Sequence, residues 1–129
     1  MSQSTTQRFH QEIRTVDLPD IRRKYEEDPH AFLECQRMID AALIRIRLFP
    51  DREGKPCEYE PLSTAGFRKV KLFSTQNQPK GESPDLRIIY RYHEQDDAVE
   101  ILSIGFRIKQ RPRPPEDPYS RAENRNFVF

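Results

Sequence analysis

Glycine, cysteine and histidine are scarce in this chain, and each shortage excludes a class of site. The four glycines among 129 residues are too scattered for the loop that holds a dinucleotide or a nucleotide phosphate. Two isolated cysteines, Cys35 and Cys57, form neither a zinc site nor a disulfide framework, and they fit a reducing compartment. The three histidines, His10, His30 and His93, lie far apart in the sequence. Any catalysis therefore depends on lysine, arginine and tyrosine, and we expect no metal or cofactor.

Long apolar runs and an excess of either charge are also missing. No apolar run approaches the roughly 20 residues of a membrane span, and the first ten residues lack the apolar core of a signal peptide, so we expect a cytoplasmic protein. Hydrophobic residues make up 35% and charged residues 33%, which allows one modest core in a single domain over 1–129. The net charge is only +1, so a site for nucleic acid would have to come from local clustering of basic residues.

The first 27 residues predict a short strand and a short helix. Residues 1–7 are polar and are expected to form a flexible tail. Weak alternation of apolar and polar residues indicates an edge strand over Phe9–Arg14. Asp17 is the expected N-cap of a helix that has Pro19 in its first turn and runs to about Glu27.

A longer helix begins at Asp28 and Pro29 and is stopped by Pro50. Apolar residues recur along it at steps of three and four, which predicts one buried stripe. The stripe consists of Phe32, Cys35, Ile39, Ala42, Leu43 and Ile46. The tight link between the two helices predicts that they pair and lie together on a sheet.

The second half of the chain predicts three strands separated by loops. A loop rich in turn residues covers 50–66, and alternation then indicates a strand over 67–73. A polar loop over 74–85 has no helical or strand pattern and is expected to be mobile. A hairpin follows, with strands over 86–92 and 98–104 on either side of the turn "HEQDD".

A proline-rich segment over 108–118 is expected to be extended, and "YSRAENR" to form a last helical turn. Because the helices precede most of the strands, the order predicts an α+β fold. In that fold two N-terminal helices pack on one face of a small, mainly antiparallel sheet. The other face of such a sheet is expected to stay open to solvent.

Basic side chains gather on the face of the sheet that the helices are not expected to cover. Lys69 and Lys71 share a face of their strand, and Arg87 and Arg91 share a face of the hairpin. Two stretches of the chain, 67–73 and 103–113, contain no acidic residue. They add Arg68, Arg107, Lys109, Arg111 and Arg113. Such charges are often only solvated, but like charges on adjoining strands destabilise a sheet, and together they favour a face that binds a phosphate backbone.

Four segments form a recognisable set: "FRKVKLF", "LRIIYRY", "VEILSIGFRI" and "PYSRAENR". Together they resemble the RelE branch of the RelE/ParE toxin superfamily, in its lysine strand, arginine strand, glycine-containing strand and C-terminal tyrosine. The resemblance covers about residues 8 to 125 and is strongest over 67–107. It implies a β-α-α-β-β-β order with a short C-terminal helix.

The resemblance implies the toxin of a type II toxin–antitoxin system, a ribosome-dependent endoribonuclease whose partners are mRNA on the ribosome and an antitoxin protein. In the family's metal-free chemistry the ribose 2′-OH attacks the adjacent phosphate. A lysine and the tyrosine share the base and orienting roles, while arginines hold the phosphate and assist the leaving oxygen. The implied catalytic set is Lys69, Lys71, Arg87, Arg107 and Tyr119. The further basic residues taken as RNA contacts are Arg68, Arg91, Lys109, Arg111 and Arg113.

This chemistry has a physical basis of its own. Fixed cations stabilise the charge that builds up on phosphorus, and crowded cations are expected to lower the pKa of a lysine or tyrosine among them. The spacer between Arg107 and Tyr119 is longer than is usual in that family, so Tyr119 either joins the site or anchors the tail. Three alternatives stay open. The protein is a non-catalytic member that binds a protein or RNA, a gyrase poison like the ParE branch, or a small scaffold whose charges are merely solvated.

Overall fold

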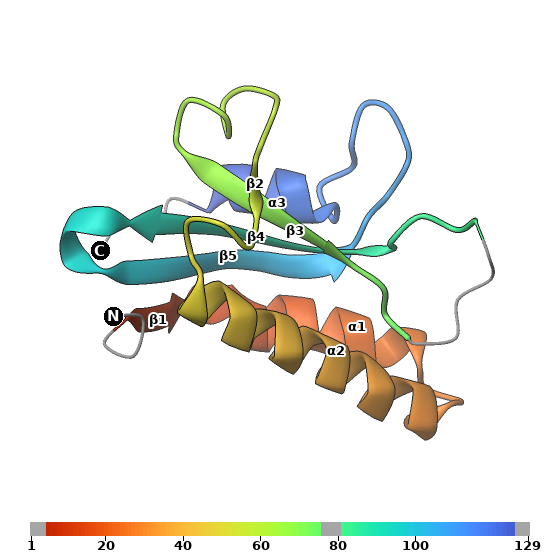
Figure 1. Cartoon of the computed structure of the whole chain (residues 1–129). Coiled ribbons are helices and arrows are strands. Elements are labelled where there is room, and N and C mark those ends of the chain that lie inside the picture. The colour runs from red at the N-terminus through yellow and green to blue at the C-terminus, as the bar shows by residue number, and fades with distance from the viewer. Residues whose placement is uncertain (1–4, 76–80, 126–129) are drawn as a thin grey trace.

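The computed structural model describes residues 5–75 and 81–125, and its strands form one sheet in the order β1-β5-β4-β3-β2 (Figure 1). The strands are β1 (Thr6–Phe9), β2 (Lys55–Pro56), β3 (Phe67–Leu72), β4 (Leu86–His93) and β5 (Ala98–Phe106). Only β1 pairs in parallel, with β5, and the other neighbours are antiparallel. The predicted α+β fold with a mainly antiparallel sheet is therefore confirmed. The two-residue β2 lies inside the segment that was expected to be a loop.

The helices are α1 (Leu18–Lys24), α2 (Pro29–Leu48) and α3 (Pro118–Asn124), with a π-helical turn over Ile13–Asp17 before α1. The first two lie side by side along one face of the sheet, and α3 lies on the other (Figure 1). Asp28 caps α2 as predicted, because its carboxylate accepts a hydrogen bond from the Ala31 amide at 3.1 Å. The predicted stripe faces the sheet: Cys35, Ile39, Ala42 and Ile46 are buried, and Phe32 and Leu43 pack against them.

Two predictions near the N-terminus are wrong. The first strand is Thr6–Phe9 and not Phe9–Arg14, so residues 6 and 7 of the expected tail belong to the sheet. Residues 1–4 of that tail lie outside the described residues. The strand is set by pairing with β5, where Thr6 lies opposite Ala98, and this long-range pairing overrides the weak local alternation.

Asp17 stands at the predicted N-cap position of α1 but does not cap the helix. Its side chain makes no capping hydrogen bond and is fully buried. It accepts the Ile104 amide of β5 at 2.8 Å and a guanidinium nitrogen of Arg125, after α3, at 2.6 Å. Arg121 approaches the same carboxylate at 3.2 Å. One carboxylate therefore ties the start of α1 to β5 and to the C-terminal segment.

The second face of the sheet is covered, contrary to the expected open face. A second hydrophobic cluster fills it with Cys57, Leu62, Phe67, Ile89, Leu102, Tyr119 and Ala122. Ile89 and Leu102 alternate with the residues that face α1 and α2, so their burial needs the cover that α3 and the chain before β3 provide. The helix side of β4 is as predicted, because Leu86, Ile88 and Tyr90 pack in the first cluster.

Side-chain hydrogen bonds fix the ends of the loop over 74–85 and the loop before β2. Residues 76–80 of the loop over 74–85 lie outside the described residues, so its expected mobility stays a prediction. Its two ends are joined, because Asp85 accepts hydrogen bonds from the Ser74 amide at 2.8 Å and from the Ser74 hydroxyl at 2.6 Å. Before β2, the Tyr90 hydroxyl donates to the Pro50 carbonyl and accepts from the Gly54 amide. A Cβ at Gly54 would lie 2.6 Å from the Tyr90 ring, so glycine is required there.

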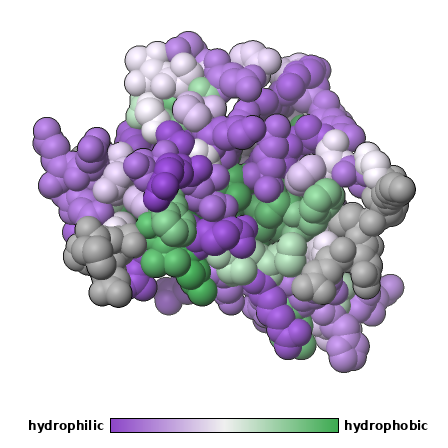
Figure 2. All heavy atoms as spheres, in the orientation of Figure 1, coloured by the Kyte–Doolittle hydropathy of each residue, from purple (hydrophilic) through white to green (hydrophobic). Residues whose placement is uncertain are grey.

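The surface reflects the lean composition. From the side of Figure 1 it is mostly hydrophilic, with hydrophobic residues showing mainly in a band across the middle (Figure 2). Across the described ranges, 5–75 and 81–125, no helix is both long and apolar enough to cross a membrane.

Candidate functional site

A cavity of about 360 Å³ opens on the sheet beside α3, and basic side chains form most of its wall. It is lined by Lys69, Lys71, Arg87, Arg107, Ile108, Lys109, Arg111, Arg113 and Tyr119. Seven of these nine residues are lysine or arginine, and none of the described lining residues is acidic. The cavity therefore contains all five residues of the expected catalytic set and three of the five expected RNA contacts. Seven of the 22 lysines and arginines of a protein of net charge +1 therefore line one cavity.

Two adjacent strands position the lysines and the central arginine. Lys69 and Lys71 alternate with the buried Val70 and Leu72 of β3, as the two-residue period predicts. Lys71 lies directly opposite Arg87 of β4 in the antiparallel ladder. Two cations at facing positions repel one another, which an anion between them would relieve.

Arg87 is almost fully buried, with 2% of its surface exposed, and this overturns the expectation of a solvent-exposed arginine. Its Nη1 donates to the carbonyls of Pro84 and Leu86, each at 2.9 Å, and its Nε donates to the Tyr119 hydroxyl at 3.1 Å. Within the described part of the chain, Nη2 makes no hydrogen bond and no carboxylate pairs with Arg87. The guanidinium is thus fixed in place and keeps one donor group for the cavity.

Tyr119 both joins the site and anchors the tail. Its ring belongs to the second hydrophobic cluster, its hydroxyl meets Arg87, and the Arg113 guanidinium lies over its ring at 4.2 Å. The helix that carries it is docked by the Ser103 hydroxyl, which donates to the Pro118 carbonyl at 2.7 Å. The long spacer before it therefore does not keep Tyr119 away from the basic residues.

Asp117, a residue that sequence reasoning missed, explains how the spacer is closed. Its carboxylate accepts the Tyr119 amide at 2.9 Å, as the N-cap of α3, and the Ile108 amide at 3.0 Å. Both ends of the segment 108–117 are thus held by one side chain, and Figure 1 shows the segment rising from β5 and returning to α3. The signal was present in the sequence, since Asp117 precedes Pro118 just as Asp28 precedes Pro29.

The surroundings change the pKa of two site residues in opposite directions. The pKa of Lys71 is lowered by desolvation and then by the neighbouring charges of Lys69 and Arg87. The pKa of Tyr119 is raised, because burial outweighs the effect of the Arg87 cation. The expected lowering by crowded cations therefore holds for the lysine and is wrong for the tyrosine. The two shifts favour the neutral amine of Lys71 and the neutral phenol of Tyr119.

Other reactive chemistry finds little support in the described residues. No group of three or more histidine, cysteine or acidic side chains in the ranges 5–75 and 81–125 could hold a metal ion. Both cysteines are buried, and burial raises the pKa of each thiol to about 11, so they stay protonated near neutral pH.

Comparison with known proteins finds similarity in structure alone. No family model and no curated protein sequence matches the chain. A chain from the crystal structure of the toxin–antitoxin complex RelBE2 of Mycobacterium tuberculosis is 21% identical, with a TM-score of 0.46; the match covers 80% of this chain and 98% of that one. A mutant of the Escherichia coli toxin RelE in the free state is 15% identical, with a TM-score of 0.43; that match covers 79% and 82%.

The identities lie below 25% and the TM-scores below 0.5, so the case for a function has to come from the residues of the site.

Two of the expected RNA contacts lie outside the cavity. Arg68 donates to the carbonyls of Asp51 and Gly54, and so holds the loop before β2. Arg91 forms an ion pair with the buried Glu100 at 2.8 Å and lies over the Phe67 ring. Their part in binding RNA stays a prediction. The nearest acid to the lysines is the exposed Glu58, whose carboxylate lies 3.8 Å from the Lys69 amine.

Proposed function

We propose that this protein is a metal-free endoribonuclease of the RelE type, which cuts mRNA on the ribosome as the toxin of a toxin–antitoxin pair in the cytoplasm. The single observation that carries the proposal is the cavity in which seven cationic side chains meet a buried tyrosine. Such a cavity suits a phosphate of a nucleic-acid backbone. The lowered pKa of Lys71 favours its neutral amine, which is the form that accepts a proton in this scheme.

In the proposed reaction the ribose 2′-OH attacks the adjacent phosphorus atom. Its proton passes to the neutral amine of Lys71, and the bond from phosphorus to the 5′-oxygen breaks. The products are a 2′,3′-cyclic phosphate and a free 5′-hydroxyl. Lys69 gives a proton to the leaving 5′-oxygen, and the Arg107 guanidinium hydrogen-bonds to that oxygen.

Arg87 acts as the fixed phosphate clamp. Three hydrogen bonds to protein groups hold its Nη1 and Nε, so Nη2 can meet a phosphate oxygen with little reorganisation. Removing one preorganised donor of this kind typically lowers the rate by around 10²–10³. In this scheme Tyr119 is a positioning residue, since its hydroxyl orients Arg87.

The proposed partner that controls the enzyme is an antitoxin protein, as the sequence resemblance implies. The excess of positive charge in the cavity supports this proposal, because a covering segment with acidic side chains would gain favourable contacts with it. The same contacts would exclude RNA.

Cleavage of mRNA on programmed ribosomes tests the function. Wild-type protein is expected to cut the message at the decoding site and to leave cyclic phosphate ends, and Arg87→Ala is expected to cut about 10²–10³-fold more slowly. Intact message in the presence of wild-type protein that binds the ribosome would refute the enzymatic reading. A parallel assay of gyrase supercoiling addresses the ParE-like alternative, for which inhibition by wild-type protein is the signature.

A further inference from the structure

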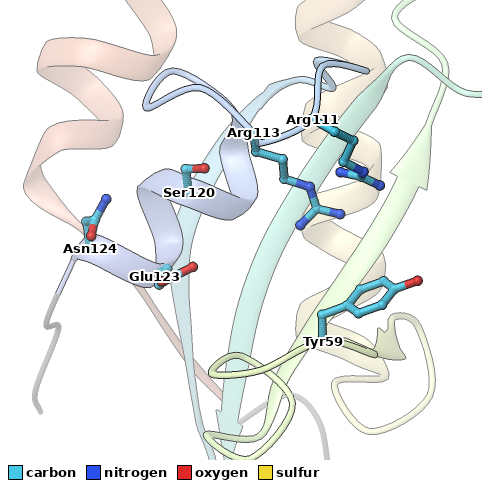
Figure 3. A pocket seen from close by; sticks show the side chains of 6 residues that line it. All are labelled: Tyr59, Arg111, Arg113, Ser120, Glu123 and Asn124. Carbon is cyan, nitrogen blue, oxygen red and sulfur yellow. The ribbon is translucent and has the colours of Figure 1, made fainter.

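A second cavity of about 500 Å³ adjoins the basic one and shares Arg111 and Arg113 with it. It is lined by Tyr59, Arg111, Arg113, Ser120, Glu123 and Asn124. Arg113 extends into the space between α3 and the segment that carries Tyr59 (Figure 3). The two cavities therefore lie side by side, with a pair of arginines common to both.

Tyr59 supplies an open aromatic surface to this second cavity. The residue is 65% exposed, and in the described ranges its ring stacks on no other aromatic side chain or cation. The turn that follows it is ordered by the Glu60 carboxylate, which accepts the Ser63 hydroxyl at 3.0 Å and the Thr64 amide at 3.2 Å. A large apolar ring is thus presented to solvent from a held turn, which limits the entropy lost when something stacks on it.

The opposite wall is polar. Ser120, Glu123 and Asn124 stand at positions i, i+3 and i+4 of α3, so they share one face of the helix. Glu123 forms no ion pair within the described residues, although two arginines line the same cavity. Hydroxyl, carboxylate and amide groups of this kind form hydrogen bonds with the edges of unpaired bases.

We infer that this second cavity is a subsite for one nucleotide of single-stranded RNA, next to the phosphate in the basic cavity. The base stacks on Tyr59, the linking phosphate lies on Arg111 and Arg113, and the base edge meets the polar face of α3. An aromatic ring beside a cationic track is how proteins hold unpaired nucleotides. A helical protein partner fits less well, because Tyr59 is the only large apolar anchor among the described lining residues.

The inference rests on the proposed function for the identity of the neighbouring phosphate, but it can be tested without cleavage. The probe is a short fluorescein-labelled RNA with 2′-O-methyl riboses, which cannot react, and its binding is followed by anisotropy at low salt. A matched series carries one abasic position at each place in turn. Stacking on an aromatic side chain contributes ~1–3 kcal/mol per base, so Tyr59→Ala should weaken binding at least about fivefold.

The variants separate stacking from other effects. Tyr59→Phe keeps the ring and should bind as the wild type does, while Phe49→Ala removes another exposed aromatic residue, outside both cavities, and should have no effect. One abasic position should weaken the wild type as much as Tyr59→Ala does, and should have no further effect on that variant. Equal binding of wild type and Tyr59→Ala, or additive losses at every position, would overturn the inference.

The same variants distinguish the subsite from the reaction. If Tyr59→Ala matches the wild type in RNA affinity and in the sequence preference of mRNA cleavage, the subsite is refuted and the reaction stands. If the wild type cuts no message but the coupling between Tyr59 and one base holds, the reaction is refuted and the subsite stands. Loss of affinity for an antitoxin alone would assign Tyr59 to a protein interface and refute the subsite.

Discussion

Replacing Tyr119 with phenylalanine removes one oxygen atom and leaves the ring in the second hydrophobic cluster. The Arg87 Nε loses its partner at 3.1 Å, while the two carbonyls that bind Nη1 remain. A hydrogen bond to a charged group contributes ~1.5–3 kcal/mol, and the two surviving bonds favour the lower end of that range. We therefore expect the free energy of unfolding to fall by about 1.5 kcal/mol and kcat to fall roughly tenfold.

The shape of the pH profile carries the mechanistic information. The pKa of Tyr119 is raised, so its phenol is protonated throughout the neutral range and is not the base. Single-turnover cleavage of ribosome-bound mRNA by Tyr119→Phe should accordingly show the wild-type pH dependence at a lower rate. Chemical denaturation measures the stability of the same preparations.

A matched control is Tyr92→Phe, which also removes a phenol hydrogen bond, to Asp97 at 2.9 Å, but near the hairpin turn. It should lower stability without changing the rate. Two results would refute the reasoning on Tyr119: a changed pH dependence, or a loss of 10²–10³ like that expected for the phosphate clamp itself. Either would make the phenol a catalytic group.

Three further variants test the surroundings of the site. Lys69→Ala removes a cation that lowers the pKa of Lys71, so the pKa of Lys71 should rise. Because the neutral amine of Lys71 is the active form, the cleavage rate should then reach its plateau at a higher pH. An unshifted pH profile would contradict this role of Lys69. Asp17→Asn leaves the buried Arg125 without its carboxylate and should cost about 3–5 kcal/mol of unfolding free energy, measured by denaturation. A loss below about 1 kcal/mol would show that the network is dispensable. Asp117→Ala should lower the free energy of unfolding by about 1 kcal/mol and weaken RNA binding, because the loop over 108–117 is released. Asp28→Ala removes an equivalent helix cap and should leave RNA binding unchanged.

The elements with strong periodicity were predictable from the sequence. The α2 stripe has four of its six members fully inside the core, and the alternation in β3 separates Lys69 and Lys71 from Val70 and Leu72 as expected. These patterns are local, since a side chain's face follows from its position in the helix or strand. The gathering of the basic residues could be foreseen for the same reason, once the strands were taken as neighbours.

Features that depend on distant partners were not predictable. Asp17 has the local signature of a helix cap, but a buried arginine more than a hundred residues away binds its carboxylate. The cover on the second face comes from α3 and the chain before β3, and neither segment indicates where it will dock. The burial of Arg87 and the raised pKa of Tyr119 both follow from that cover. Because the cover could not be foreseen, a solvent-exposed Arg87 and a lowered pKa for Tyr119 were expected.

The two hydrogen bonds that Asp117 accepts make the position of Tyr119 in the basic cavity independent of the length of the loop over 108–117. Because one carboxylate holds Ile108 and Tyr119 together, residues can be added to or removed from the segment between them without moving the tyrosine. The arginines on that segment can then change through mutation while the clamp beneath them stays constant. Under the proposed function, such an arrangement would let substrate preference change while the chemistry stays the same.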